Sequence, residues 1–341
     1  HAAAAWVDGD QFEKGTKAAK VANALADLAQ NDPQAFTKAL SVVAPQEAPN
    51  VQAETLDMTD KLLLTIGKYL SKQDTGGLSS GDELQDVTIW AKGYYGESKL
   101  SNYGKVRGFD SKNKGVIAGF DIKLDKAVKV GVGFQYNDSD VDGYRRDIEV
   151  DSLIGFVYGE YRPSKWFVNG VASFGKSDYD EEKYAVGKQI KDNYSAGVYS
   201  LQALTGYDFK YVTPEVGARY YRIKRHGYDD NLGQKISGKD MDLMRGVFGL
   251  RSSYQFGMFK PEVYAGITYD FVSDEDNALV SLPNGSSYTV DGKRLKRFGT
   301  EFSLNVTAQV TDNTKIGAGY EGKFREHYQD HSGMINVKYE F

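Results

Sequence analysis

The chain has 341 residues, a formal net charge of −5 and no cysteine. The mild, mixed charge argues against nucleic acid as a partner, and the lack of cysteine excludes a disulfide framework and thiol chemistry. With 24 Tyr, 17 Phe and 37 Gly, the composition is typical of β-barrels with aromatic girdles, and no apolar run is long enough for a transmembrane helix.

Residues 1–45 are predicted to be helical. Apolar stripes at helical spacing cover 18–28 and 36–43, and Asn31-Asp32-Pro33 between them supplies a break, a cap and a proline at the first helical position. The chain starts without a signal peptide, so we expect a fragment or a processed product. This stretch is interpreted as connecting structure ahead of the main fold.

A further helix is predicted from Val51 to Lys72, ahead of a glycine-rich turn. Asp57, Lys61 and Lys68 are its candidate anchoring charges. The charges are expected around much of its circumference, which makes the helix too polar to face lipid. About 20 residues span ~30 Å, so the helix could cross a polar tube of bilayer thickness. The alternative is a surface helix packed by its leucine stripe on a soluble domain.

From Val87 onward the pattern has period two, which predicts strands. From Val128 to Tyr136, for example, apolar residues alternate with Lys, Gly and Gln. In the fourth and fifth strands both faces are apolar, so the inward face stays ambiguous there. The twelve expected strands are 87–98, 112–124, 127–138, 148–161, 165–178, 192–208, 211–225, 239–255, 258–271, 294–308, 313–325 and 331–341.

The connections alternate between short turns and longer polar segments. The longer ones are expected at 99–111, 139–147, 179–191, 226–238 and 272–293, with a short one at 326–330. Short turns on one side and long loops on the other indicate a transmembrane barrel. Twelve strands leave a lumen for about one helix. The predicted fold class is therefore all-β: a 12-stranded antiparallel transmembrane β-barrel with an N-terminal α-helix through the lumen.

The last strand places Ile335, Val337, Tyr339 and the terminal Phe341 on one apolar face. A soluble protein rarely leaves such an edge open, because it invites aggregation. We therefore expect this strand to close the barrel.

Several stretches together resemble the C-terminal translocator domain of bacterial autotransporters, the type V secretion family. They are the helix ahead of the strands, Trp90 in the first strand, Gly206 to Glu215, Gly246 to Arg251, Lys260 to Tyr264, Gly317 to Phe324 and the terminal Phe341. No single motif is specific, and the resemblance depends on their order over about residues 50–341.

The resemblance implies a monomer held by outer-membrane lipid, and export of an N-terminal passenger to the cell surface. It also implies periplasmic chaperones and the barrel-assembly machinery, which reads the C-terminal signal formed by Ile335, Val337, Tyr339 and Phe341. The expected divisions are 1–49 as a helical junction or passenger remnant, 50–80 as the linker helix and turn, and 81–341 as the barrel.

The strand phase places five charged residues inside the barrel. They are Glu215, Arg219, Arg251, Glu262 and Glu301. Buried charges must be paired or hydrated, so this belt is expected to bond its own members, water or the helix. The alternative is a set of scattered, solvated pore charges. Tyr95, Tyr136, Tyr269 and Tyr339 are expected to face lipid at the interfaces.

No catalytic residue, cofactor or metal site is expected. His327, Asp330, His331 and Ser332 superficially suggest a hydrolase, but no oxyanion arrangement is recognisable around them. Some family members cut their linker with an asparagine; Asn50 precedes the helix here, but the paired-asparagine motif is missing.

Two other functions stay open. A porin-like passive channel would have no need of the helix at 51–72, and a soluble β-sandwich adhesin domain conflicts with the segregated loop lengths and with the Phe341 terminus.

Overall fold

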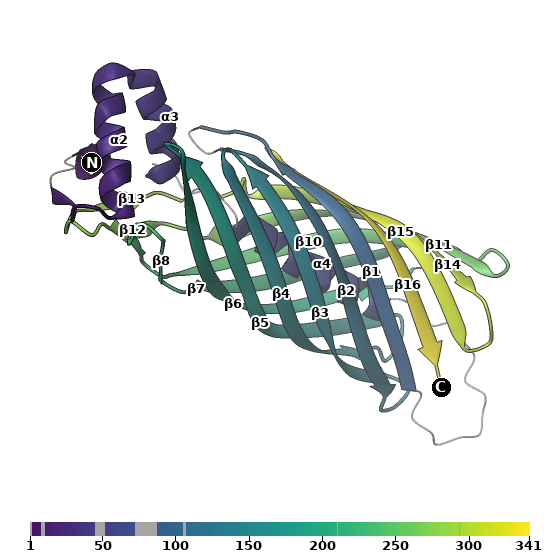
Figure 1. Cartoon of the computed structure of the whole chain (residues 1–341). Helices are drawn as coiled ribbons and strands as arrows, with labels where there is room; N and C mark the ends of the chain where they lie inside the picture. The colour runs from purple at the N-terminus through teal and green to yellow at the C-terminus, as the bar shows by residue number, and fades with distance from the viewer. Residues whose placement is uncertain are drawn as a thin grey trace.

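Twelve long strands form a closed antiparallel barrel around one helix in this computed structural model (Figure 1). The structure describes residues 2–7, 11–44, 52–71, 87–104, 107–209, 211–292 and 294–341. The barrel strands are β1 (Val87–Leu100), β2 (Phe109–Lys123), β3 (Val128–Gly143), β4 (Arg146–Tyr161), β5 (Trp166–Ala185), β6 (Lys188–Tyr207), β7 (Thr213–Arg225), β10 (Lys239–Ser253), β11 (Phe259–Ser273), β14 (Phe298–Gln309), β15 (Thr314–Arg325) and β16 (Tyr328–Glu340).

The remaining described elements are four helices and four short strands. They are α1 (Ala2–Val7), α2 (Lys17–Asn31), α3 (Pro33–Val43), α4 (Gln52–Leu70), β8 (Tyr228–Asp229), β9 (Lys235–Ile236), β12 (Ala278–Ser281) and β13 (Ser287–Val290). None of these helices is long and apolar enough to cross a membrane.

The barrel closes between its first and last strands. β1 pairs with β16 from Thr88 opposite Glu340 to Leu100 opposite Tyr328. The amide of Phe341 extends this seam by donating to the Val87 carbonyl at 2.9 Å. The fold prediction is confirmed. We call the end that holds Val87 and Phe341 the near end and the opposite one the cap end.

Side chains alternate between the outside and the lumen along each strand. In β3, Val132 and Phe134 are about half exposed on the outside, whereas Gln135 is buried in the lumen. In β4, Ile154 and Phe156 face inward and Leu153 faces outward. In β5, Phe167 and Val171 face inward and Phe174 faces outward, so the phase of both strands that the sequence left ambiguous is settled.

The prediction of long loops at 139–147 and 179–191 is wrong. Residues 139–147 and 179–191 continue the paired strands up to two-residue turns, and β5 and β6 each reach 20 residues. The segments at 226–238 and 272–293 contain the four short strands. These segments were predicted to be loops because their sequences are polar and the apolar alternation fades, although the backbone pairing continues in them.

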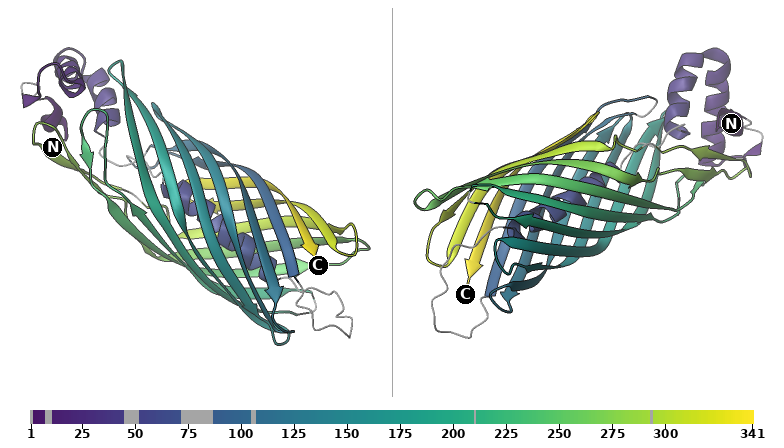
Figure 2. Two further views of the ribbon diagram at one scale, coloured as in Figure 1. Left: turned by 60° about the horizontal axis from the view of Figure 1, so that its bottom comes forward. Right: turned by 180° about the vertical axis from the view of Figure 1, so that it is seen from behind.

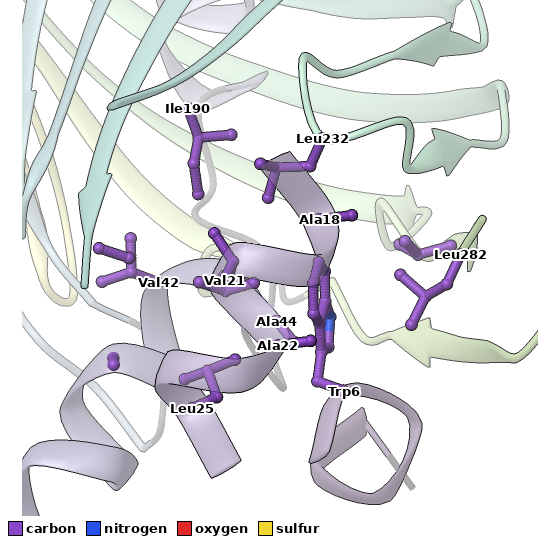
Figure 3. Close-up of a cluster of buried hydrophobic side chains, with 14 of the residues drawn as sticks. Trp6, Ala18, Val21, Ala22, Leu25, Val42, Ala44, Ile190, Leu232 and Leu282 are labelled. Atoms are coloured by element: carbon purple, nitrogen blue, oxygen red, sulfur yellow. The ribbon is translucent and has the colours of Figure 1, made fainter. Parts of the chain in front are cut away.

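At the cap end, α1–α3 form one apolar cluster with the four-stranded sheet β13-β12-β9-β8 and the end of β5; α1 lies on β13 and α3 on β5 (Figure 2). The predicted break between α2 and α3 is confirmed, because Pro33 opens α3 and the Asp32 carboxylate accepts from the Ala35 amide at 2.9 Å. We call α1–α3 and this sheet, together with the tip of the β5–β6 hairpin, the cap (Figure 3).

Candidate functional site

The helix α4 runs through the lumen and is enclosed by the barrel (Figures 1 and 2). From Ala53 to Ser71, every side chain except those of Leu56 and Tyr69 is buried. At 100° per residue, α4 has an apolar face with Leu62, Ile66 and Leu70 opposite a charged face. Each face meets a different wall of the lumen, and this contact is the candidate functional site.

The apolar wall is formed by lumen-facing residues of β2, β4, β5 and β6. They are Ile117, Ile154, Phe156, Val171 and Val198, all buried in one cluster with Leu62, Leu63, Ile66 and Leu70 of α4. The backbone of α4 lies closest to β3, β4, β5 and β6. The helix therefore sits off-centre and packs tightly against this wall.

Aromatic side chains in the lumen lie over glycines of the neighbouring strand. Trp90 in β1 is paired with Gly119 in β2, and Tyr158 in β4 with Gly131 in β3. A Cβ atom on Gly119 or Gly131 would come within 2.6 or 2.3 Å of these rings. Glycine is needed there because only a bare backbone lets the ring lie flat on the wall.

The charged wall is formed by lumen-facing residues of β7, β10, β14, β15 and β16. They are Arg219, Arg245, Glu301, Glu321, Lys323 and Asp330.

Asp60 of α4 is the centre of one group on the charged wall. Its carboxylate pairs with Arg219 at 3.2 Å and with Arg245, and it accepts from the Tyr221 hydroxyl. Arg219 also binds Glu301 at 2.5 Å. One helix carboxylate thus joins two arginines from neighbouring strands, and all these side chains are buried.

A second group surrounds Asp57 and Lys61. Lys61 binds Asp330 at 2.8 Å and Asp57, one turn earlier, at 3.1 Å. The Lys323 ammonium donates to the Asp57 carboxylate at 2.8 Å. Asp330 and Lys323 face each other on β16 and β15. The charges in this group compensate one another, as burial requires.

Toward the near end, Glu321 accepts from both Lys68 of α4 and Lys92 of β1. Arg251 donates to the Lys68 carbonyl at 3.1 Å and pairs with Glu215 at 3.0 Å. The last turn of α4 leaves backbone carbonyls without helical partners, and Arg251 satisfies one of them.

The two ends of the lumen differ in packing. At the cap end, Ala53 lies in a buried apolar cluster with Leu100, Phe109 and Tyr328. At the near end, a cavity of about 510 Å³ lies between α4 and the wall of β1, β11 and β14–β16. A much smaller cavity of about 70 Å³ lies beside Ala53 and Leu56 at the cap end, so the lumen is filled more tightly there than at the near end.

Comparison with known proteins decides what this arrangement is. The family model for the autotransporter β-domain matches residues 89–321, more than half of the chain. The chain belongs to the autotransporter β-domain family. It lies in the bacterial outer membrane, with the near end of this β-domain toward the periplasm and the cap end toward the cell exterior.

Relatives and solved structures agree. Outer membrane protein B of Rickettsia prowazekii is 23% identical over 332 residues, covering 86% of this chain and 20% of the relative. The β-domain thus spans about a fifth of that relative's length. The translocator domain of NalP from Neisseria meningitidis has the same fold, with a TM-score of 0.72 and 18% identity, covering 87% of this chain and 100% of that one. The transport unit of AIDA-I from Escherichia coli follows with a TM-score of 0.58, 14% identity, and coverage of 82% and 97%.

All five residues of the expected lumen belt are buried on the charged side of the lumen. Arg219 and Glu301 form one pair, and Arg251 and Glu215 form another. The arginine of each pair also binds α4. Glu262 lines the near-end cavity. Their role in anchoring the helix stays a prediction.

The expectation that charges surround α4 is wrong. Glu54, Asp57, Asp60, Lys61 and Lys68 fall within one side of the helical wheel, because their spacings return to the same face every three or four residues.

Sequence patterns did not single out Lys92, Arg245, Glu321 and Lys323, nor Asp270 and Arg325. Asp270 pairs with Arg245 at 2.6 Å and with Arg325 at 2.9 Å. The phase in β15 could have found three of these residues, because Glu321, Lys323 and Arg325 alternate with Gly322 and Phe324.

The outward residues lie where the sequence placed them. Tyr95, Tyr136, Tyr269 and Tyr339 are all exposed on the barrel exterior, as are Ile335, Val337 and Phe341.

The residues considered for hydrolysis are brought together only in part: the Ser332 hydroxyl donates to the Asp330 carboxylate at 3.4 Å, but neither histidine joins them. Asp330 and Ser332 are buried in the lumen, whereas His331 faces outward and contacts the Tyr320 hydroxyl, and His327 stacks on Tyr103. Asn50 lies outside the described residues. In the described ranges, no group of three or more His, Asp or Glu side chains is arranged to hold a metal ion.

Proposed function

We propose that this β-domain anchors a displayed N-terminal polypeptide by holding α4 in its lumen after export. The observation that carries the proposal is the set of buried ion pairs between α4 and the charged wall, centred on Asp60 and Lys61. Apolar packing alone would let a helix slide or rotate. Directional charge-assisted bonds to separate strands fix its depth and rotation.

The belt residues would act in this anchoring. Arg219 links Asp60 of α4 to Glu301, and Arg251 holds the last turn through the Lys68 carbonyl while Glu215 neutralises it. The role is mechanical and requires no catalytic residue, cofactor or metal.

The chain would divide into a displayed helical junction at 1–49, a linker helix and turn at 50–80, and the barrel at 81–341. The displayed part would continue into a passenger ahead of residue 1. The curated relatives are about five times longer than the matched region, which leaves room for one in proteins of this kind.

Assembly would depend on the last strand. Ile335, Val337, Tyr339 and Phe341 form an apolar outward face on β16 that is exposed until lipid covers it. We propose that periplasmic chaperones and the barrel-assembly machinery bind this face, and that the finished barrel works as a monomer. Replacing Phe341 with Ser is expected to reduce the fraction of folded, heat-modifiable barrel in outer membranes, with Glu340→Ser as the neighbouring control.

The anchoring role is tested with Arg251→Met in a full chain that carries a tagged passenger. We expect weaker ordering of α4, seen as more frequent openings in planar bilayers, with the barrel still heat-modifiable. A version lacking residues 1–72 should give the large, open conductance. If Arg251→Met leaves both the openings and passenger display unchanged, Arg251 has no anchoring role. Equal conductance with and without residues 1–72 would indicate a porin-like channel.

A further inference from the structure

The cap joins two parts of the chain that are far apart in sequence. Its apolar core combines α1–α3 with residues from three extracellular hairpins of the barrel (Figure 3). From the helices come Trp6, Val21, Ala22, Leu25 and Val42; from the hairpins come Ala185, Ile190, Leu232, Val280, Leu282, Tyr288 and Val290. Trp6, Val21, Leu25 and Ile190 are completely buried. The core is therefore as shielded from solvent as the interior of a folded protein.

The hairpin β12–β13 has one face made for this contact. Val280 and Tyr288 are buried against the helices, while Leu279 and Thr289, their neighbours along the strands, face solvent. One polar bond joins this hairpin to the helices, and a second joins it to the turn between β8 and β9. The Asn284 side chain donates to the Ala5 carbonyl at 3.2 Å, and the Tyr288 hydroxyl donates to Gln234 at 2.9 Å.

At the tip of the β5–β6 hairpin, the backbone is strained at a residue that makes the same contact with the helices. Val186 has a φ of 45°, a left-handed conformation that is unfavourable for a β-branched residue. Its side chain packs against the cap core. A polar residue or glycine would suit the turn better, so the valine is explained by packing against the helices.

We propose that the cap is a non-covalent clamp that holds the N-terminal segment, residues 2–44, on the rim of the barrel. The helices stay bound to the hairpins by packing alone, so they remain at the rim when the chain between Ala44 and α4 is cut. This inference does not depend on the proposed role of α4, because the cap lies outside the lumen and uses other residues.

The test uses the full chain with an N-terminal tag and a site-specific protease sequence inserted within residues 45–51. The purified protein is cut in detergent, and size-exclusion chromatography shows whether the tagged fragment elutes with the barrel. We expect co-elution after complete cutting, which a denaturing gel verifies. A fragment that leaves the barrel on cutting overturns the proposal.

A pair of adjacent substitutions identifies the contact. Val280→Lys places a charge in the cap core and should raise the released-to-retained ratio by about tenfold or more, since burying an unpaired charge is costly. Leu279→Lys adds the same charge on the exposed side of β12 and should leave the fragment bound. Equal release from both variants would show that the buried face of β12 is not the contact.

Trp6→Ala provides a test from the helix side. Trp6 is stacked on Phe12 with ring centroids 5.4 Å apart and belongs to the released fragment, so its loss cannot unfold the barrel. We expect release comparable to that of Val280→Lys, with unchanged heat-modifiable migration of the barrel. Retention of the fragment in both Trp6→Ala and Val280→Lys would overturn the clamp.

Discussion

The two walls of the lumen hold the same helix by different physical means. The apolar wall packs Ile66 and Leu70 against Ile154 and Val171, so α4 lies close to β3–β6. The charged wall reaches across a wider gap with long side chains such as Arg219 and Arg245. Apolar packing is non-directional and supplies affinity, whereas the ion pairs are directional and supply position. The comparison suggests that affinity and register are separable in this β-domain.

Asp60→Asn should have the largest effect on α4. It removes the carboxylate shared by Arg219 and Arg245. Glu301 and Asp270 still neutralise these arginines, so the expected cost is about 1.5 to 3 kcal/mol for each of the two charge-assisted bonds that are lost. We expect a lower unfolding temperature in detergent and frequent channel openings in planar bilayers. Asp27→Asn, on the exposed side of α2, is the control and should change neither. An Asp60 variant with normal openings would show that the charged wall does not set the position of α4.

Ile154→Ala weakens the apolar wall without touching a charge. The cavity it creates should reduce the free energy of unfolding by about 2 to 5 kcal/mol. Channel openings should increase less than in Asp60→Asn, because the ion pairs still hold the register. Leu153→Ala, one residue away on the lipid-facing side of β4, is the matched control. If Ile154→Ala opened the channel as often as Asp60→Asn, affinity and register would not be separable.

The charges that line the near-end cavity predict the ion selectivity of the channel. Lys68, Lys92, Lys260, Lys315 and Lys338 line it, against the carboxylates of Glu262 and Glu321. The residual current should therefore prefer anions. Replacing Lys260 and Lys315 with Glu should lower the anion-to-cation permeability ratio several-fold, measured as a reversal potential in a salt gradient. Lys176→Glu, on the exposed outside of β5, should leave the ratio unchanged.

Asp230→Asn should have the smallest effect, and it concerns the cap. Burial raises the pKa of the Asp230 carboxyl, outweighing the hydrogen bonds from Gln234 and Leu232 that lower it. The folded cap therefore binds this proton more tightly than the unfolded chain. The resulting stabilisation is complete below the unfolded pKa and is lost as the pH rises through the folded one.

Asparagine keeps an oxygen for the two backbone amides and is neutral at every pH, but it no longer accepts from the Gln234 side chain, which donates to Asp230 at 2.6 Å. Fragment retention after cutting should therefore change less with pH than the parent's, by less than about 1 kcal/mol between acid and neutral pH. A variant whose retention falls toward neutral pH as steeply as the parent's would contradict this sign.

The barrel could be predicted from sequence because one rule, period-two alternation, repeats twelve times. The phase of β4 was ambiguous for a reason that the structure explains. Ile154 and Phe156 are apolar although they face the lumen, because α4 presents leucines to them. A rule that assumes a polar lumen fails where the lumen is filled by an apolar helix face.

The partners on the charged wall were harder to predict. Period-two phase placed Arg219 and Glu301 inside, but it carries no information on which strand lies opposite which turn of α4. The pairing of Asp60 with Arg245 joins residues 185 positions apart. The cap escaped prediction for a related reason: β12 and β13 have only four residues each, too few to show a period.

Because β5 and β6 are long, the rim of the barrel at the cap end is uneven in height. Twenty residues at about 3.3 Å each, tilted by about 40°, rise roughly 50 Å, while the hydrocarbon layer takes up only about 30 Å. This hairpin stands well above the lipid surface, whereas β14 and β15, with 12 residues each, end much lower. The rim at the cap end is therefore oblique, and the cap is attached at its taller side. The opening at this end therefore faces away from the tall side, at a slant to the membrane.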